Sequence, residues 1–196
     1  MNRGICRSKS GVTYIADYQD NPERKCPVRI YATSDFDDFT TAWEFPPGAI
    51  RHIHALVPDS ETPGRIWVLT GDEDHECHFL YTDDDFISVK AYLSKGQMTR
   101  TADLIFRTGK LIWGMDSPLE TSYLLSSGRD NPEVTRLLEL PGPVYYMAQN
   151  QAGGIYCGTT VEAGPAVKDR FGRVYGSRPD ETWDELVRCR DDFFPQ

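Results

Sequence analysis

Short runs of apolar residues alternate along the whole chain with segments rich in Gly, Pro, Asp and Asn. The runs contain many Val, Ile, Tyr and Trp residues, and the 3.6-residue spacing of an amphipathic helix is nearly missing. β-branched and aromatic residues bounded by turn-forming residues are typical of β-strands. The pattern therefore predicts an all-β chain.

The runs recur in register about every 45 residues. In each unit the second run carries an aromatic residue and leads into a polar loop; Trp67 and Trp113 are 46 positions apart, and Trp113 and Tyr156 are 43 apart. Four short strands in a unit of this length are typical of a β-propeller blade. We therefore predict a single domain over 1–196 with about four four-stranded blades, in units 1–49, 50–98, 99–142 and 143–196. Trp67 and Trp113 are expected in equivalent core positions.

The arrangement of four blades leaves two alternatives open. The blades could close a small ring, or they could form an open arc whose exposed sheet edges need a cover. An open arc predicts self-association or a protein partner on those edges. A β-sandwich is the alternative fold, because it also consists of short strands between frequent turns.

The turn between the third and fourth strands contains hydroxyl and acidic residues. Residues 82–89 (TDDDFISV), 177–183 (SRPDETW) and, more loosely, 34–40 (SDFDDFT) resemble the Asp-box, Ser-x-Asp-x-Gly-x-Thr-Trp, of sialidase-superfamily (BNR) propellers. Together with 21–24, 51–54, 67–74, 113–118 and 141–146, they make the chain similar to about four blades of longer, uncharacterised BNR/Asp-box-like proteins. This resemblance implies a fold. The Arg triad and Tyr nucleophile of true sialidases match no motif here, so it implies no sialidase chemistry.

The net charge of −9 argues against nucleic-acid binding and against docking on an anionic membrane. No apolar run approaches the ~18–20 residues of a membrane-spanning helix. The first residues are followed by no apolar segment of the kind found in a signal peptide, so we expect a cytoplasmic location or one inside a larger particle. The five cysteines are widely spaced and odd in number, which favours reduced thiols over a disulfide framework.

Two histidines provide the most specific catalytic hypothesis. His52 and His54 should lie on the same side of a strand, because side chains alternate with a period of two. With Asp72 or Asp116 they could act as acid and base near neutral pH. The alternative is that both are structural histidines bonded to neighbouring carboxylates.

An acidic segment, 71–78 (GDEDHECH), follows one of the Trp-containing runs. Carboxylate and imidazole ligands could hold a divalent cation there, and no other cofactor is predicted. The alternative is a solvated hairpin loop. The candidate ligands are Asp72, Asp74, His75, Glu76 and His78.

Loops from successive blades should meet at one end of a propeller, giving an acidic face that also contains His and Arg. Asp103, placed among apolar neighbours, needs a partner, for which Arg51 or Arg100 is the natural choice. The predicted ligand-binding residues of this face are Arg51, Asp74, Glu76, Arg100, Asp103, Glu120, Tyr145 and Glu162.

The function best supported by these features is binding or processing of a glycan or another polar ligand on this face. A non-catalytic interaction or structural role in a larger assembly is the alternative. A metal-dependent enzyme is a third hypothesis, and the sequence leaves open whether the protein is an enzyme at all.

Overall fold

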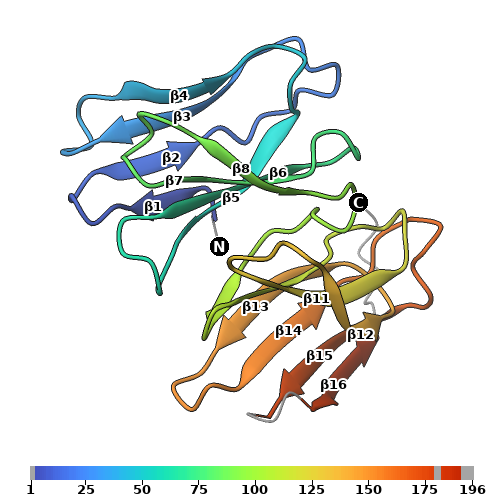
Figure 1. The fold of residues 1–196 in the computed structure, drawn as a ribbon. Helices are drawn as coiled ribbons and strands as arrows, with labels where there is room; N and C mark the ends of the chain where they lie inside the picture. Colours follow the sequence, from blue (N-terminus) through green and yellow to red (C-terminus); the bar gives the residue numbers. More distant parts are fainter. Residues whose placement is uncertain (1–2, 179–181, 191–196) are drawn as a thin grey trace.

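The computed structural model describes residues 3–178 and 182–190, and within them it contains sixteen strands in four sheets (Figure 1). We number the sheets as blades 1 to 4. Blade 1 contains β1 (Ile5–Arg7), β2 (Thr13–Ala16), β3 (Val28–Thr33) and β4 (Thr40–Phe45). Blade 2 contains β5 (His52–Pro58), β6 (Ile66–Gly71), β7 (His78–Thr82) and β8 (Lys90–Ser94). Blade 3 contains β9 (Ile105–Arg107), β10 (Lys110–Gly114), β11 (Ser122–Gly128) and β12 (Thr135–Leu140). Blade 4 contains β13 (Val144–Gln149), β14 (Ile155–Thr159), β15 (Phe171–Ser177) and β16 (Trp183–Arg190).

Every blade is an antiparallel meander in which each strand pairs with its neighbours in sequence. The all-β prediction and the four four-stranded units are therefore confirmed. The sheets are not closed into a ring: blade 1 lies at one end of the array in Figure 1 and blade 4 at the other. Of the two arrangements that the sequence left open, the structure has the open arc. The described residues contain no helix that could cross a membrane.

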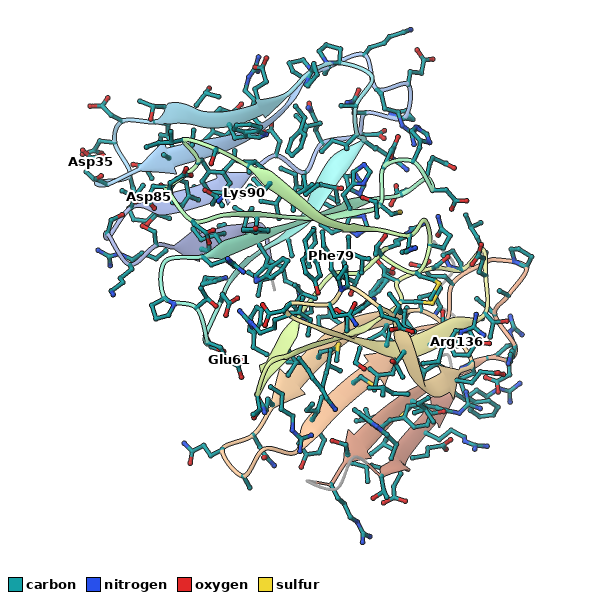
Figure 2. All side chains as sticks on the ribbon, viewed as in Figure 1. Asp35, Glu61, Phe79, Asp85, Lys90 and Arg136 are labelled. Carbon is teal, nitrogen blue, oxygen red and sulfur yellow. The ribbon has the colours of Figure 1, made fainter. Side chains whose placement is uncertain are left out.

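Three apolar clusters fill the seams between successive blades. The seam between blades 1 and 2 contains Cys6, Tyr14, Val28, Ile30, Ile53, Leu56, Ile66 and Val68. The seam between blades 2 and 3 contains Trp67, Leu69, Phe79, Leu111, Trp113 and Leu125, and Phe79 lies near the middle of Figure 2. The seam between blades 3 and 4 contains Ile112, Leu124, Val144, Met147, Ile155 and Cys157. Each sheet thus buries apolar side chains against the next, as the repeat predicts.

Trp67 and Trp113 are fully buried, but they do not occupy equivalent positions. Trp67 belongs to the face of blade 2 that meets blade 3, whereas Trp113 belongs to the face of blade 3 that meets blade 2. Phe79 lies against Trp113, with ring centroids 5.0 Å apart. The expectation of equivalence was wrong because the spacing between the two residues does not reveal which face of the strand each one occupies.

The turn between β7 and β8 is organised by side-chain hydrogen bonds. The Thr82 hydroxyl accepts the Phe86 amide at 3.0 Å, and Asp84 accepts both the amide and the hydroxyl of Ser88, at 2.9 and 2.6 Å. The turn directs the buried Phe86 ring against Tyr14 of blade 1, with centroids 4.7 Å apart. The turn therefore contributes to the packing of blade 2 on blade 1.

Candidate functional site

A pocket of about 490 Å³ lies where the first strands of the blades converge. It takes residues from segments spread over most of the chain, as expected for the central opening of a propeller. Its lining residues are Arg3, Tyr18, Arg51, His52, His54, Asp72, Arg100, Ala102, Asp116, Tyr145 and Tyr146.

The two histidines lie together on β5, the first strand of blade 2. Their ring centroids are 4.9 Å apart, and both side chains are buried. The Tyr18 ring, which is 71% exposed, stacks on His52 at 4.3 Å. A side chain at Gly71, on the neighbouring strand β6, would come within 3.0 Å of His54, so a glycine leaves room for that imidazole. The sequence thus places an aromatic layer, Tyr18–His52–His54, along one side of the pocket.

Asp72 directly follows β6 and lies at the centre of the charged groups. Its carboxylate accepts hydrogen bonds from Arg51 Nη1 at 2.9 Å and pairs with Arg100 Nη2 at 3.2 Å. Nε2 of His54 is 3.1 Å from Asp72 Oδ1, and Nε2 of His52 is 3.6 Å from it. Burial acts to raise the pKa of Asp72. The neighbouring imidazoles and the Arg100 charge outweigh burial and hold this pKa well below its ordinary value.

Asp116 follows β10, on the other side of His54. Its Oδ2 is 3.8 Å from His54 Nδ1, and its amide donates to the carbonyl of Arg100 at 2.8 Å. Burial raises the pKa of Asp116 to about 8; Arg100 opposes this rise, and Glu162 and Asp72 add to it. Asp116 therefore holds a proton at neutral pH, whereas Asp72 is ionised. Burial also lowers the pKa of His54, which keeps its imidazole neutral at pH 7.

Several buried polar atoms around this pocket have no hydrogen-bond partner among the described residues. They include the donors Arg51 Nε and Arg100 Nε, one ring nitrogen each of His52 and His54, and Asp116 Oδ1. Buried polar groups are nearly always paired in folded proteins. Such a concentration of unpaired atoms at one pocket is typical of a site that a polar ligand completes.

The other predicted binding residues differ in how close they lie to the pocket. Arg51, Arg100 and Tyr145 line the pocket. Glu162 lies close enough to raise the pKa of Asp116, and burial raises the pKa of Glu162 itself. Glu120 is exposed and does not line the pocket.

Asp103 precedes β9 and pairs with Arg3, which also donates to the carbonyl of Ala102 at 3.1 Å. The expectation that Arg51 or Arg100 would be its partner was wrong. Arg3 reaches Asp103 from the start of blade 1, across 100 positions of sequence, and no local pattern indicates that contact. Arg3 also lies over the Tyr146 ring, 5.5 Å from its centroid.

The predicted cation ligands of 71–78 do not share one site. Asp74 accepts a hydrogen bond from Gln97 at 2.9 Å, the buried Glu76 pairs with Arg24, and His78 bonds to Ser94 at 2.7 Å. The remaining histidine of the segment, His75, has a side chain that is 71% exposed. These contacts are typical of a loop held by hydrogen bonds and an ion pair to its neighbours. They are not typical of several ligands that face one cation.

A different group does bring three ligand atoms together. One atom each of His52, His54 and Asp72 lies within 4.8 Å of the others, the only such cluster in the described part of the chain. The guanidinium groups of Arg51 and Arg100 already contact Asp72, and their charge disfavours a cation there. The electrostatics therefore favour an uncharged polar or anionic ligand over a metal ion.

Sequence reasoning missed four lining residues, Arg3, Tyr18, Ala102 and Tyr146. Tyr18 lies just after β2, in the same class of loop as Asp72, so the repeat carried a signal that could have identified it. Tyr146 is next to the predicted Tyr145, and Arg3 lies two positions before β1. Its place at the pocket depends on the packing of β1 against β5, where the Leu56 amide donates to the Arg3 carbonyl.

No family model matches the sequence, and a search of curated proteins finds no match. Among solved structures, the chain is similar to a putative TolB from Agrobacterium tumefaciens, with a TM-score of 0.62, 13% identity, and coverage of 96% of this chain and 66% of the other. A fucose-recognising, six-bladed fungal lectin from Aleuria aurantia gives a TM-score of 0.57, 11% identity, and coverage of 94% and 58%. The Bacteroides ovatus protein GH43B of a xyloglucan utilisation locus gives 0.52, 11%, and coverage of 94% and 40%. The chain thus has a propeller fold and spans less than two thirds of the length of these proteins.

Proposed function

We propose that the pocket binds a saccharide and that this binding is the primary function of the chain. The observation that carries the proposal is the combination of an exposed aromatic ring, Tyr18, with buried unpaired donors and an acceptor on the pocket floor. Sugar rings offer apolar C–H faces that pack on aromatic rings, and their hydroxyls both donate and accept hydrogen bonds. The pocket has an aromatic ring to pack on a C–H face, and it has unpaired donors and an acceptor to bond the hydroxyls.

The layered arrangement of the aromatic residues supports this assignment. Tyr18 is stacked on His52, so one ring face is supported by protein and the opposite face is free for a ligand. Tyr145 and Tyr146 border the same pocket, and their ring centroids are 6.4 Å apart. A saccharide could thus lie between aromatic residues of blades 1 and 4 while its hydroxyls approach Arg51, Arg100 and the histidines.

The structural neighbours are compatible with a carbohydrate-related role. One recognises fucose and another belongs to a xyloglucan utilisation locus. Their sequence identities of 11% relate the folds alone, so the assignment for this chain depends on its own pocket.

Glycan-array screening followed by calorimetry tests the proposal. A glycan that binds the wild-type chain should lose at least tenfold in affinity when Tyr18→Ala removes the stacking ring. Phe39→Ala is the matched control, because Phe39 is 50% exposed and does not line the pocket. Failure of every glycan to bind, or equal loss from both variants, would contradict saccharide binding at this site.

Processing of the bound glycan is a second candidate, favoured by the two aspartates. Asp116 is protonated at neutral pH and Asp72 is ionised, and a pair of carboxyl groups with separated pKa values is the usual arrangement for acid–base catalysis. The same screen decides between the candidates. Product release from a bound glycan supports processing, whereas an unchanged glycan after prolonged incubation supports binding alone.

A further inference from the structure

Two turns in neighbouring blades each hold a phenylalanine near a threonine hydroxyl, at a spacing of three residues in blade 1 and four in blade 2, but their surroundings are opposite. In blade 2 the Phe86 amide donates to the Thr82 hydroxyl at 3.0 Å, and in blade 1 the Phe36 amide donates to the Thr33 hydroxyl at 2.8 Å. Both phenylalanines have positive φ angles, 68° for Phe86 and 67° for Phe36. Phe86 is 3% exposed, whereas Phe36 is 62% exposed. Asp35 and Asp85, which mark these two turns, lie at the same edge of the molecule in Figure 2.

The difference arises from what lies next to each turn. Phe86 packs on Tyr14, the second residue of β2, and the Tyr14 hydroxyl donates to the carbonyl of Asp85 at 3.4 Å. Among the described residues, no tyrosine ring contact is found for Phe36. A phenylalanine held at positive φ is strained, and in blade 2 this strain is offset by burial. In blade 1 nothing in the described chain covers the ring.

Tyr14, the residue on which Phe86 packs, has an equivalent on blade 4. Tyr156 is the second residue of β14, as Tyr14 is of β2, and it lies on the face that points away from blade 3, because its neighbours Ile155 and Cys157 pack in that seam. Gly176 is paired with Tyr156 on the next strand, and a side chain at Gly176 would meet both Tyr156 and Leu186. Tyr156 and Leu186 therefore form one continuous apolar surface across blade 4.

The exposed apolar residues at the two ends of the arc extend these surfaces. On blade 4, Leu186 is 52% exposed, Val187 49% and Val174 36%. On blade 1, Ile5 is 45% exposed and is paired with Ile15, which is paired in turn with Tyr31 across the sheet. These two outer faces are the two halves of a seam between blades, and the chain carries both.

We propose that the chain associates head to tail with a second copy of itself, so that the blade 4 face of one copy packs on the blade 1 face of the next. In this seam Tyr156 takes the place of Tyr14, and Phe36 takes the place of Phe86. The occupant is a second copy because the two faces repeat the halves of the seam that already joins blades 1 and 2. The interface is heterologous, joining two different surfaces.

Sedimentation velocity at micromolar concentration tests the proposal. The wild-type chain should sediment as a dimer or a larger assembly. Phe36→Asp should disable the blade 1 face and Leu186→Asp the blade 4 face, and each variant should sediment as a single chain. Ile87→Asp is the matched control, because Ile87 is 85% exposed and lies on neither outer face, and it should assemble like the wild type. Both test positions are exposed, so folding should be unaffected.

Mixing the two disabled variants distinguishes a head-to-tail seam from any symmetric contact. Phe36→Asp retains an intact blade 4 face, and Leu186→Asp retains an intact blade 1 face. An equimolar mixture should therefore form a one-to-one complex, whereas each variant alone remains a single chain. A monomeric wild type, a single variant that still assembles, or a mixture that stays monomeric would each overturn the proposal. Glycan binding is measured separately, so its result does not affect this one.

Discussion

Two aspartates lie at opposite ends of the β5–β6 hairpin, and they differ in burial and in how many of the polar groups around them are left unpaired. Asp59 follows β5 at one end, and Asp72 follows β6 at the other. Both contact arginine, and the exposed fraction of the side chain is 0% for Asp59 and 13% for Asp72. The same hairpin thus presents one carboxylate that serves the fold and one that faces a pocket.

The Asp59 end is a closed network. Oδ1 accepts the amides of Glu61 and Thr62, both at 2.8 Å, while Oδ2 accepts Trp67 Nε1 at 2.9 Å and Arg129. The ion pair with Arg129 joins blade 2 to blade 3. Each oxygen of Asp59 therefore accepts two hydrogen bonds from protein donors.

The Asp72 end has the opposite character. Its carboxylate attracts two arginines and two histidines, yet several nitrogens of those same side chains remain unpaired. Unsatisfied buried donors cost stability, and they persist where function requires them. The comparison teaches that burial and ion pairing alone do not identify a site. Among the described residues, five unpaired polar atoms gather at the Asp72 pocket, whereas the Asp59 network contains one, Arg129 Nη1.

The largest effect should come from breaking the closed network. Asp59→Ala leaves Arg129 as a buried charge without its main partner and removes the hydrogen bond of Trp67, so we expect a loss of about 3–5 kcal/mol in the free energy of unfolding. Urea denaturation measures this loss. Glycan binding should be unchanged at temperatures where the variant is folded. A loss below about 1 kcal/mol would show that Asp59 stabilises no more than a surface ion pair does.

The sequence predicted the fold better than it predicted these networks. Strand composition and the repeat identified the four sheets. The residues that form a strand and the turns beside it are close together in the sequence, so their pattern can be recognised locally. The period-two rule brought His52 and His54 together correctly, and Asp72 and Asp116 follow equivalent strands, β6 and β10, of successive blades. All four line one pocket.

The networks themselves lay beyond sequence reasoning because they join residues that are far apart in the chain. Arg129 reaches Asp59 across 70 positions, and Arg3 reaches Asp103 across 100. The sequence around a charged residue does not indicate its partner, because the pairing depends on how the blades pack together. The face occupied by Trp113 was also hidden, because a shift of one residue exchanges the two sides of a strand.

The second prediction uses the raised pKa of Asp116. In the unfolded chain this carboxyl loses its proton near pH 4, whereas in the folded chain burial raises the pKa to about 8. The folded state therefore binds the extra proton between these values, and its contribution to stability is complete at low pH and lost as the pH rises toward 8. The contribution changes by up to ~1.4 kcal/mol per pH unit.

Asp116→Asn should remove this contribution. The free energy of unfolding of the variant should fall less steeply between pH 4 and 8 than that of the wild type, measured by urea denaturation at a series of pH values. The difference between the two proteins isolates Asp116, because His54 and Glu162 titrate in both. Parallel curves would mean that Asp116 is ionised in the folded chain, which would also remove the basis for its role as a proton donor.

The smallest effect on folding should come from Arg51→Gln, which is the counterpart of the Asp59 experiment. The Arg51 side chain is 33% exposed, and Asp72 keeps its contact with Arg100 at 3.2 Å when Arg51 is removed. Loss of a partly exposed ion pair, when Asp72 keeps another partner, should lower the free energy of unfolding by less than about 1 kcal/mol.

Glycan affinity should nevertheless fall in Arg51→Gln, because Arg51 presents an unpaired Nε at the pocket. Calorimetry and urea denaturation on the same preparation measure both quantities. A large loss of stability with unchanged affinity would show that the Asp72 end serves the fold as the Asp59 end does, and the contrast between the two ends of the hairpin would disappear.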